Sequence, residues 1–159
     1  DSLKTFGQYV TPENSPVQPE RFHGFHAGTD YEIFEGEERI EIPVHAIGAG
    51  VLKQSLTVNG YGGVVVLEHE IDGDIYTILY GHLDPASMVS EMNARVELGE
   101  RIGVLGEGFS EEVDGERKHL HLSIRPGSSV DLRGYVASEA DLEAWIDPEV
   151  FLEGAGSPL

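Results

Sequence analysis

The 159-residue chain has no cysteine, only one tryptophan and no long apolar run. Without cysteine it can form neither a disulfide nor a thiolate metal site. No apolar stretch approaches the roughly 18 residues that a membrane-spanning helix needs, and no signal-peptide pattern opens the chain. We therefore expect no membrane span in these residues, and expect any signal segment of a precursor to lie outside them.

Basic residues are also scarce. Lysine and arginine together number 10 against 29 acidic residues, which gives a formal net charge of −19. Such a surface repels the phosphates of nucleic acids and anionic lipid headgroups, so we expect neither as a partner. For most of these carboxylates we expect nothing more specific than a solvated acidic surface.

The length and the 40% hydrophobic content fit a single folded domain. Pro12, Pro16 and Pro19 lie among polar residues and predict an extended N-terminal arm over residues 1–20. Residues 21–153 are predicted to form the domain and residues 154–159 a tail. We find no internal repeat, and we favour a monomer.

Short strand patterns fill most of the sequence, which contains twenty glycines. Residues 64–67 predict a buried strand, and Asp72-Gly73 is a strong hairpin signal. Alternation after this hairpin places Tyr80 and His82 on the same face of the next strand. Ser138 is expected to cap one short helix, and Asp147-Pro148 to begin another. The pattern predicts an all-β, mainly antiparallel domain with a short C-terminal helix.

Five of the seven histidines and one aspartate are grouped near three short motifs. The motifs are His26 to Asp30, preceded by His23, then Tyr80-Gly81-His82, and His119-Leu120-His121. Imidazole and carboxylate are the ligands that Zn²⁺ accepts from a chain without cysteine. Two histidines and one carboxylate would leave a fourth position open for water, as in catalytic zinc sites.

Each motif is weak on its own. His119 and His121 are two residues apart in a predicted strand and so point to the same face, where one imidazole can bind a metal while the other reaches water or substrate. Spacing does not say which residue does which. Gly28 disfavours a helix between His26 and Asp30, so a strand end or turn is expected to bring them inward. The simpler alternatives are histidines on a half-solvated strand and an aspartate bonded to its own turn.

Taken together, the motifs resemble the LytM/lysostaphin-like zinc metalloendopeptidases, which cleave peptide links in bacterial cell walls. The order and spacing agree across nearly the whole chain, over residues 21–30, 44–51, 60–66, 79–83, 96–103 and 119–121 and at Asp147-Pro148. The resemblance implies a LytM-like β-sandwich, or barrel-sandwich hybrid, acting in the cell envelope, either periplasmic or secreted. It also implies that peptidoglycan peptides are the substrate.

Carried over residue by residue, the resemblance implies that His26, Asp30 and His121 bind one Zn²⁺ per chain. It implies that His82 and His119 are the catalytic pair beside the open position. Their imidazoles can accept a proton, stabilise an oxyanion and protonate a leaving amine. The resemblance does not divide these roles between them. His23, His45 and His69 match no catalytic position and are expected to be core or surface residues.

One segment departs from the family pattern. The family has a small Ser/Thr/Gly-rich loop before His-x-His, whereas this chain has a polar, acidic loop over residues 106–118 that predicts a functional flap. We expect Arg117 and Lys118 in it to be solvated rather than to meet a substrate carboxylate. Two alternatives to an enzyme remain at this stage: a non-catalytic wall-binding or amidase-activating module, and a lipoyl-like carrier domain. Against the carrier, this chain has no lysine at the hairpin tip where a lipoyl-like domain needs one.

Overall fold

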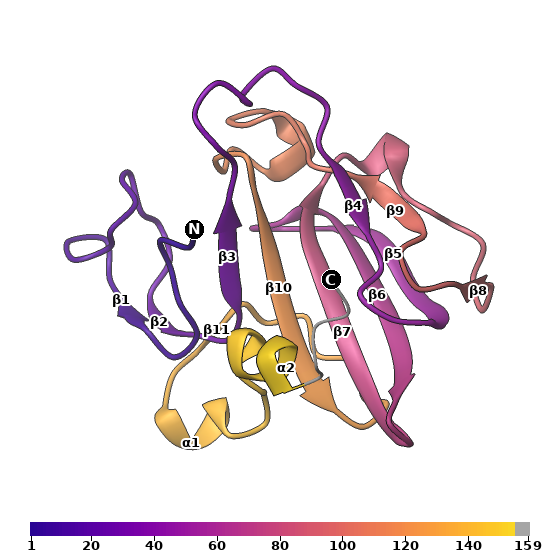
Figure 1. Ribbon diagram of the computed structural model, residues 1–159. Coiled ribbons are helices and arrows are strands. Elements are labelled where there is room, and N and C mark those ends of the chain that lie inside the picture. Colours follow the sequence, from indigo (N-terminus) through magenta and orange to yellow (C-terminus); the bar gives the residue numbers. More distant parts are fainter. Residues whose placement is uncertain (155–159) are drawn as a thin grey trace.

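An open six-stranded antiparallel sheet forms the centre of the computed structural model, which describes residues 1–154 (Figure 1). In spatial order its strands are β3 (Thr29–Glu32), β10 (His119–Pro126), β7 (Asp74–Leu83), β6 (Gly62–Ile71), β5 (Gly50–Val58) and β8 (Arg95–Val96). The sheet does not close into a barrel. The predicted antiparallel all-β class is confirmed.

The longest pairing is the hairpin of β6 and β7, and the predicted turn joins them. Asp72 and Gly73 both have positive φ, 53° and 84°. This is the type I′ geometry whose twist matches that of the flanking strands. The two ten-residue strands therefore form the centre of the sheet.

Within residues 1–154, two smaller sheets and four short helices complete the fold. One sheet contains β1 (Tyr9–Val10), β2 (Gly24–His26) and β11 (Tyr135–Val136), and the other pairs β4 (Pro43–His45) with β9 (Arg101–Val104). The helices are η1 (Pro85–Ser87), η2 (Glu111–Val113), α1 (Glu139–Leu142) and α2 (Pro148–Gly154). Ser138 caps α1 by accepting a hydrogen bond from the Asp141 amide, as predicted. No helix within residues 1–154 is long and apolar enough to span a membrane.

The two faces of the central sheet differ in what covers them. The main core lies between one face and the β4–β9 pair, and α2 packs against the same core through Phe151 and Leu152. Its central side chains are Leu52, Val65, Leu67, Ile78, Tyr80, Leu122, Ile124 and Ile102. The opposite face carries only a small cluster of Tyr61, Val64, Val66 and Leu79. The histidines of β10 point to this less covered face.

The N-terminal arm lies against the strands that carry the predicted ligands. β1 pairs with β2, and Ser2 forms a bridge with Tyr31 on β3. Lys4 of the arm is buried and forms an ion pair with Glu20. The predicted boundary between an arm, 1–20, and a domain, 21–153, stays a prediction. Of the predicted tail, residue 154 ends α2 and residues 155–159 lie outside the described residues.

Candidate metal site and catalytic centre

The register of the central sheet brings Asp30 and His121 together. In the β3–β10 ladder Asp30 lies directly opposite His121, and Glu32 lies opposite His119. Residues opposite each other on antiparallel strands have Cβ atoms about 5 Å apart, so their side chains meet. Residues 91 positions apart in the sequence thus become neighbours through strand pairing alone.

His26 reaches the same point from the end of β2. Only Ala27 and Gly28 separate β2 from β3, so the chain turns inward between the two expected ligands. A Cβ on Gly28 would lie 2.6 Å from the Leu122 carbonyl oxygen and 2.7 Å from the His121 imidazole. Glycine is required because the backbone passes this close to β10.

Three ligand atoms converge there. His26 Nε2 lies 3.1 Å from His121 Nδ1 and 3.2 Å from Asp30 Oδ1, and the remaining side of the triangle is 2.9 Å. Tetrahedral Zn²⁺ with ligand bonds of 2.0–2.1 Å separates its ligand atoms by about 3.3 Å. All three residues are buried. The donor set and its spacing therefore fit one face of a zinc tetrahedron.

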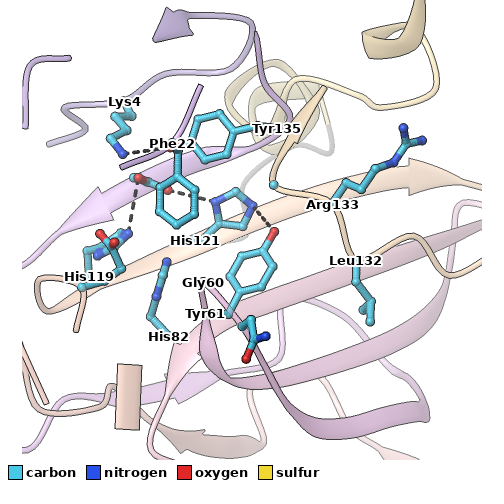
Figure 2. A pocket seen from close by; sticks show the side chains of 14 residues that line it. Lys4, Phe22, Gly60, Tyr61, His82, His119, His121, Leu132, Arg133 and Tyr135 are labelled. Carbon is cyan, nitrogen blue, oxygen red and sulfur yellow. Dashed lines mark hydrogen bonds and ion pairs between the residues drawn. The ribbon is translucent and has the colours of Figure 1, made fainter. Parts of the chain in front are cut away.

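Neighbouring groups orient both imidazoles. His26 Nδ1 lies 3.2 Å from the Thr5 carbonyl oxygen, to which it donates, so the Nε2 lone pair faces the other ligands. His121 Nε2 lies 3.4 Å from the Tyr61 hydroxyl, and its Nδ1 faces Asp30 (Figure 2). Each ring thus has one nitrogen engaged and the other free to bind a metal.

The protonation states also suit a cation. Burial lowers the pKa of His121 to about 4, so this imidazole is neutral at neutral pH. Burial alone would raise the pKa of Asp30, but the neighbouring His26 and His119 hold it well below its usual range. Neutral imidazole and ionised carboxylate are the forms that bind Zn²⁺.

His82 and His119 lie side by side next to this cluster, with ring centroids 4.1 Å apart. His119 donates from Nδ1 to the Arg117 carbonyl oxygen at 2.8 Å. Within residues 1–154, His82 Nδ1 is buried without a hydrogen-bond partner. Burial and His119 lower the pKa of His82 well below its usual value, so it is a neutral base. A buried nitrogen left unpaired costs about 1–3 kcal/mol, which a bound water or substrate group would recover.

The predicted direction of the His82 side chain is wrong. Alternation placed it on the face of Tyr80, which packs in the main core. Gly81 pairs with Val64 and Leu83 pairs with Gly63, so His82 is an extra residue in β7 with φ of 65°. Such a bulge redirects the side chain, and here His82 turns toward His119.

The cluster opens into a cavity of about 280 Å³ (Figure 2). Aromatic side chains and a few charged groups line it, chiefly Phe22, Tyr61, Tyr135, Lys4, Glu116 and Arg133. Phe22 and Tyr135 stack with ring centroids 5.1 Å apart. The mixture of apolar walls and few polar groups is typical of a ligand site.

The structure changes the interpretation of the acidic loop. Arg117 is only 12% exposed and contacts Asp30 and Glu32, and Lys118 donates to the carbonyls of Glu37, Glu38 and Ile40. The expectation that both are solvated is therefore wrong. Arg21 also holds the loop, through Glu116 at 2.9 Å. The available signal was the pair of basic residues, Arg117 and Lys118, directly before His-x-His.

The sequence pattern also did not predict Thr5 and Lys4 of the arm as neighbours of the site.

The three histidines expected to be bystanders lie outside the site. His69 is buried and lies 3.0 Å from the Ala49 carbonyl oxygen, His23 contacts the Tyr9 hydroxyl, and His45 is exposed.

A family model for Peptidase family M23 matches residues 24–132, which include all five predicted site residues. The chain belongs to peptidase family M23. It is thereby a peptidase by family, and the expected family resemblance is confirmed.

One sequence relative and two solved structures show what the chain is similar to. An endolysin of Staphylococcus phage 2638A is 27% identical over 144 residues, which are 89% of this chain. The chain spans only 28% of that endolysin. The catalytic domain of the antimicrobial peptidase lysostaphin from Staphylococcus simulans superimposes with a TM-score of 0.64 at 21% identity, covering 96% of this chain and 92% of the other. LytU has the same score and identity, with 96% and 84% covered.

Proposed function

We propose that the chain is a zinc-dependent endopeptidase that hydrolyses peptide cross-links or bridges of bacterial peptidoglycan. The observation that carries this proposal is the triangle of His26, Asp30 and His121 ligand atoms beside the His82–His119 pair. Zinc, when bound, lowers the pKa of a coordinated water and polarises the scissile carbonyl.

The roles of the chain's own groups follow from their contacts. His119 donates from Nδ1 to the Arg117 carbonyl, so Nε2 faces the site, where it lies 3.3 Å from Asp30 Oδ2. His82 offers a neutral buried ring with an unused Nδ1. Between them, the two imidazoles can take up a proton from the attacking water and deliver one to the leaving amine. The cavity beside them is open to solvent, so a substrate peptide can reach both imidazoles.

The choice of substrate rests on the relatives. Lysostaphin is an antimicrobial peptidase and the phage relative is an endolysin. Membership of family M23 and these likenesses support peptidoglycan peptides as the substrate of this chain. Action on that polymer would place the enzyme in the cell envelope, either periplasmic or secreted. The retention of all five positions argues against a non-catalytic wall-binding module, because such modules normally lack one or more ligands.

Metal analysis and wall digestion test this proposal together. The purified chain should hold about one zinc per molecule, and mass spectrometry of digested walls with defined cross-links should show newly cleaved peptide bonds. Replacing His82 or His119 by alanine should abolish cleavage and leave zinc bound. Replacing His26, Asp30 or His121 by alanine should remove the zinc.

Two results would contradict it. A wild-type chain that holds no zinc even after zinc addition would refute the metal site. A zinc-loaded chain that binds walls without releasing any peptide would favour the non-catalytic module.

A further inference from the structure

Arg117 links the metal-site carboxylate to a second carboxylate on the same strand. Its Nη2 lies 3.1 Å from Asp30 Oδ2, and its Nε lies 2.9 Å and 3.1 Å from the two oxygens of Glu32. Nη2 also contacts Glu32 Oε1. Asp30 and Glu32 are two residues apart on β3 and so point to the same face. One guanidinium therefore spans both side chains.

The two oxygens of the Asp30 carboxylate have different partners. Oδ1 faces His26 and His121, whereas Oδ2 faces Arg117 and His119. A carboxylate rotates about its Cβ–Cγ bond unless its second oxygen is held. Arg117 provides that hold together with His119, whose Nε2 lies 3.3 Å from Oδ2, and Oδ1 is left for the metal.

The same residue also orients one of the catalytic imidazoles. The Arg117 carbonyl accepts the Nδ1 hydrogen of His119 at 2.8 Å. Burial of the arginine is what fixes this backbone, since its side chain is 12% exposed and anchored at β3. Lysine could not replace it fully, because a point charge cannot span two carboxylates in a fixed geometry.

We propose that Arg117 is a positioning residue of the metal site, which holds Asp30 to one-oxygen ligation and keeps His119 in register with it. The inference rests on the proposed zinc site. Removing the guanidinium loosens the hold on Asp30 Oδ2, so that both oxygens can turn toward the metal, and leaves the half-buried Glu32 without its counter-ion. Coordination geometry and turnover should then change while the zinc-binding residues are all present.

The test uses the full chain with Co²⁺ in place of zinc, because the intensity of its visible absorption reports coordination number and geometry. R117Q should lower that intensity markedly and reduce kcat about 10- to 100-fold, with KM changed much less. R117K should fall between R117Q and wild type. R21Q is the matched control, since Arg21 holds the same loop through Glu116 and does not touch Asp30. It should leave both readouts unchanged.

The outcomes separate this inference from the proposed function. A wild-type chain that binds neither Co²⁺ nor zinc refutes the metal site itself. A metal-loaded R117Q with the wild-type spectrum and kcat overturns the role of Arg117 and leaves the zinc proposal intact. Equal effects of R21Q and R117Q also overturn it, because any loosening of the loop would then suffice. If R117Q does not fold, R117K decides: a wild-type spectrum and kcat overturn the inference.

Discussion

The proposed metal site has room to form because Gly28 has no side chain beyond a hydrogen atom. The backbone there passes so close to β10 that a methyl group would overlap the Leu122 carbonyl and the His121 imidazole. His121 cannot move away freely, because Gly81 lies opposite it on β7 and Tyr61 contacts its other nitrogen. The glycine is thus part of the ligand geometry.

We predict that Gly28→Ala weakens zinc binding at least about tenfold, because the displaced imidazole can no longer complete the ligand triangle. Competition with a chelator measures this directly. Gly73→Ala is the control, since Gly73 has a φ of 84°, unlike Gly28, and a Cβ there meets nothing within 4 Å. It should cost about 1–2 kcal/mol of stability through backbone strain and leave zinc affinity unchanged. Normal zinc affinity in Gly28→Ala would contradict the steric argument.

The sequence predicted which residues form the candidate site better than it predicted the contacts between them. The family pattern named His26, Asp30, His121, His82 and His119, and the structure gathers all five. Arg117 was expected in solvent because a charged residue in a loop usually is solvated. Its partner Glu32 becomes visible only once the register of β3 on β10 is known. Long-range pairing of this kind leaves no local trace in a single sequence.

At the scale of elements, the N-terminal arm supports the strand that carries His26. The Gly7 amide donates to the His26 carbonyl, and the His26 amide donates to Gln8. Thr5 accepts the imidazole hydrogen of His26. The arm therefore fixes both the backbone and the ring of one ligand.

Removing residues 1–8 should lower zinc affinity about 10- to 100-fold, because His26 loses the group that sets its tautomer. Chelator competition and thermal unfolding should be measured together. Ser138→Ala, which removes the cap of α1, should cost about 1 kcal/mol of stability and leave zinc affinity unchanged. If the arm deletion lowers stability but leaves zinc affinity unchanged, as expected for Ser138→Ala, the arm only stabilises the fold.

Elements were predictable where the pattern is local. The β6–β7 turn, the Ser138 cap and the helix after Asp147 all follow from residues adjacent in sequence. The bulge at His82 does not, because it arises where β7 meets β6 out of step at Gly63 and Val64. The alternating pattern therefore predicted strand β7 correctly but the direction of the His82 side chain wrongly.

At the scale of the whole molecule, acid stability should depend on the buried Lys4–Glu20 pair. Burial alone would raise the pKa of Glu20, but Lys4 and hydrogen bonds from Phe22 and Ser15 outweigh it and hold this pKa below its usual range. A lowered folded-state pKa means that ionised Glu20 stabilises the fold above its unfolded pKa of about 4.3. That contribution is lost as the pH falls through the folded-state pKa.

Thermal unfolding between pH 6 and pH 3 tests whether this contribution to stability is lost as the pH falls. Glu20→Gln should be less stable at pH 6, because Lys4 stays buried without its counter-ion. Its melting temperature should fall less than that of wild type on acidification. A decline as steep as that of wild type would show that other carboxylates control acid unfolding.

The net charge of −19 should make the proposed cleavage of cell walls salt-dependent. Anionic walls repel an acidic enzyme, and raising ionic strength from 0.01 M to 0.15 M shortens the screening length from about 30 Å to about 8 Å. We expect KM on anionic walls to fall over this range and hydrolysis of a small neutral peptide to stay constant. A fall in the peptide rate as well would point to salt acting on the site itself.

The wide separation of the proposed ligands has a consequence for the durability of the chain. His26 and His121 are 95 positions apart, so an ion held between them would cross-link most of the polypeptide. Because these ligands meet only in the folded chain, the ion would stabilise the native state by binding to it, and resistance to proteolysis would depend on metal occupancy. The proposed metal site would thereby hold together distant segments of a chain that has no cysteine with which to form a disulfide.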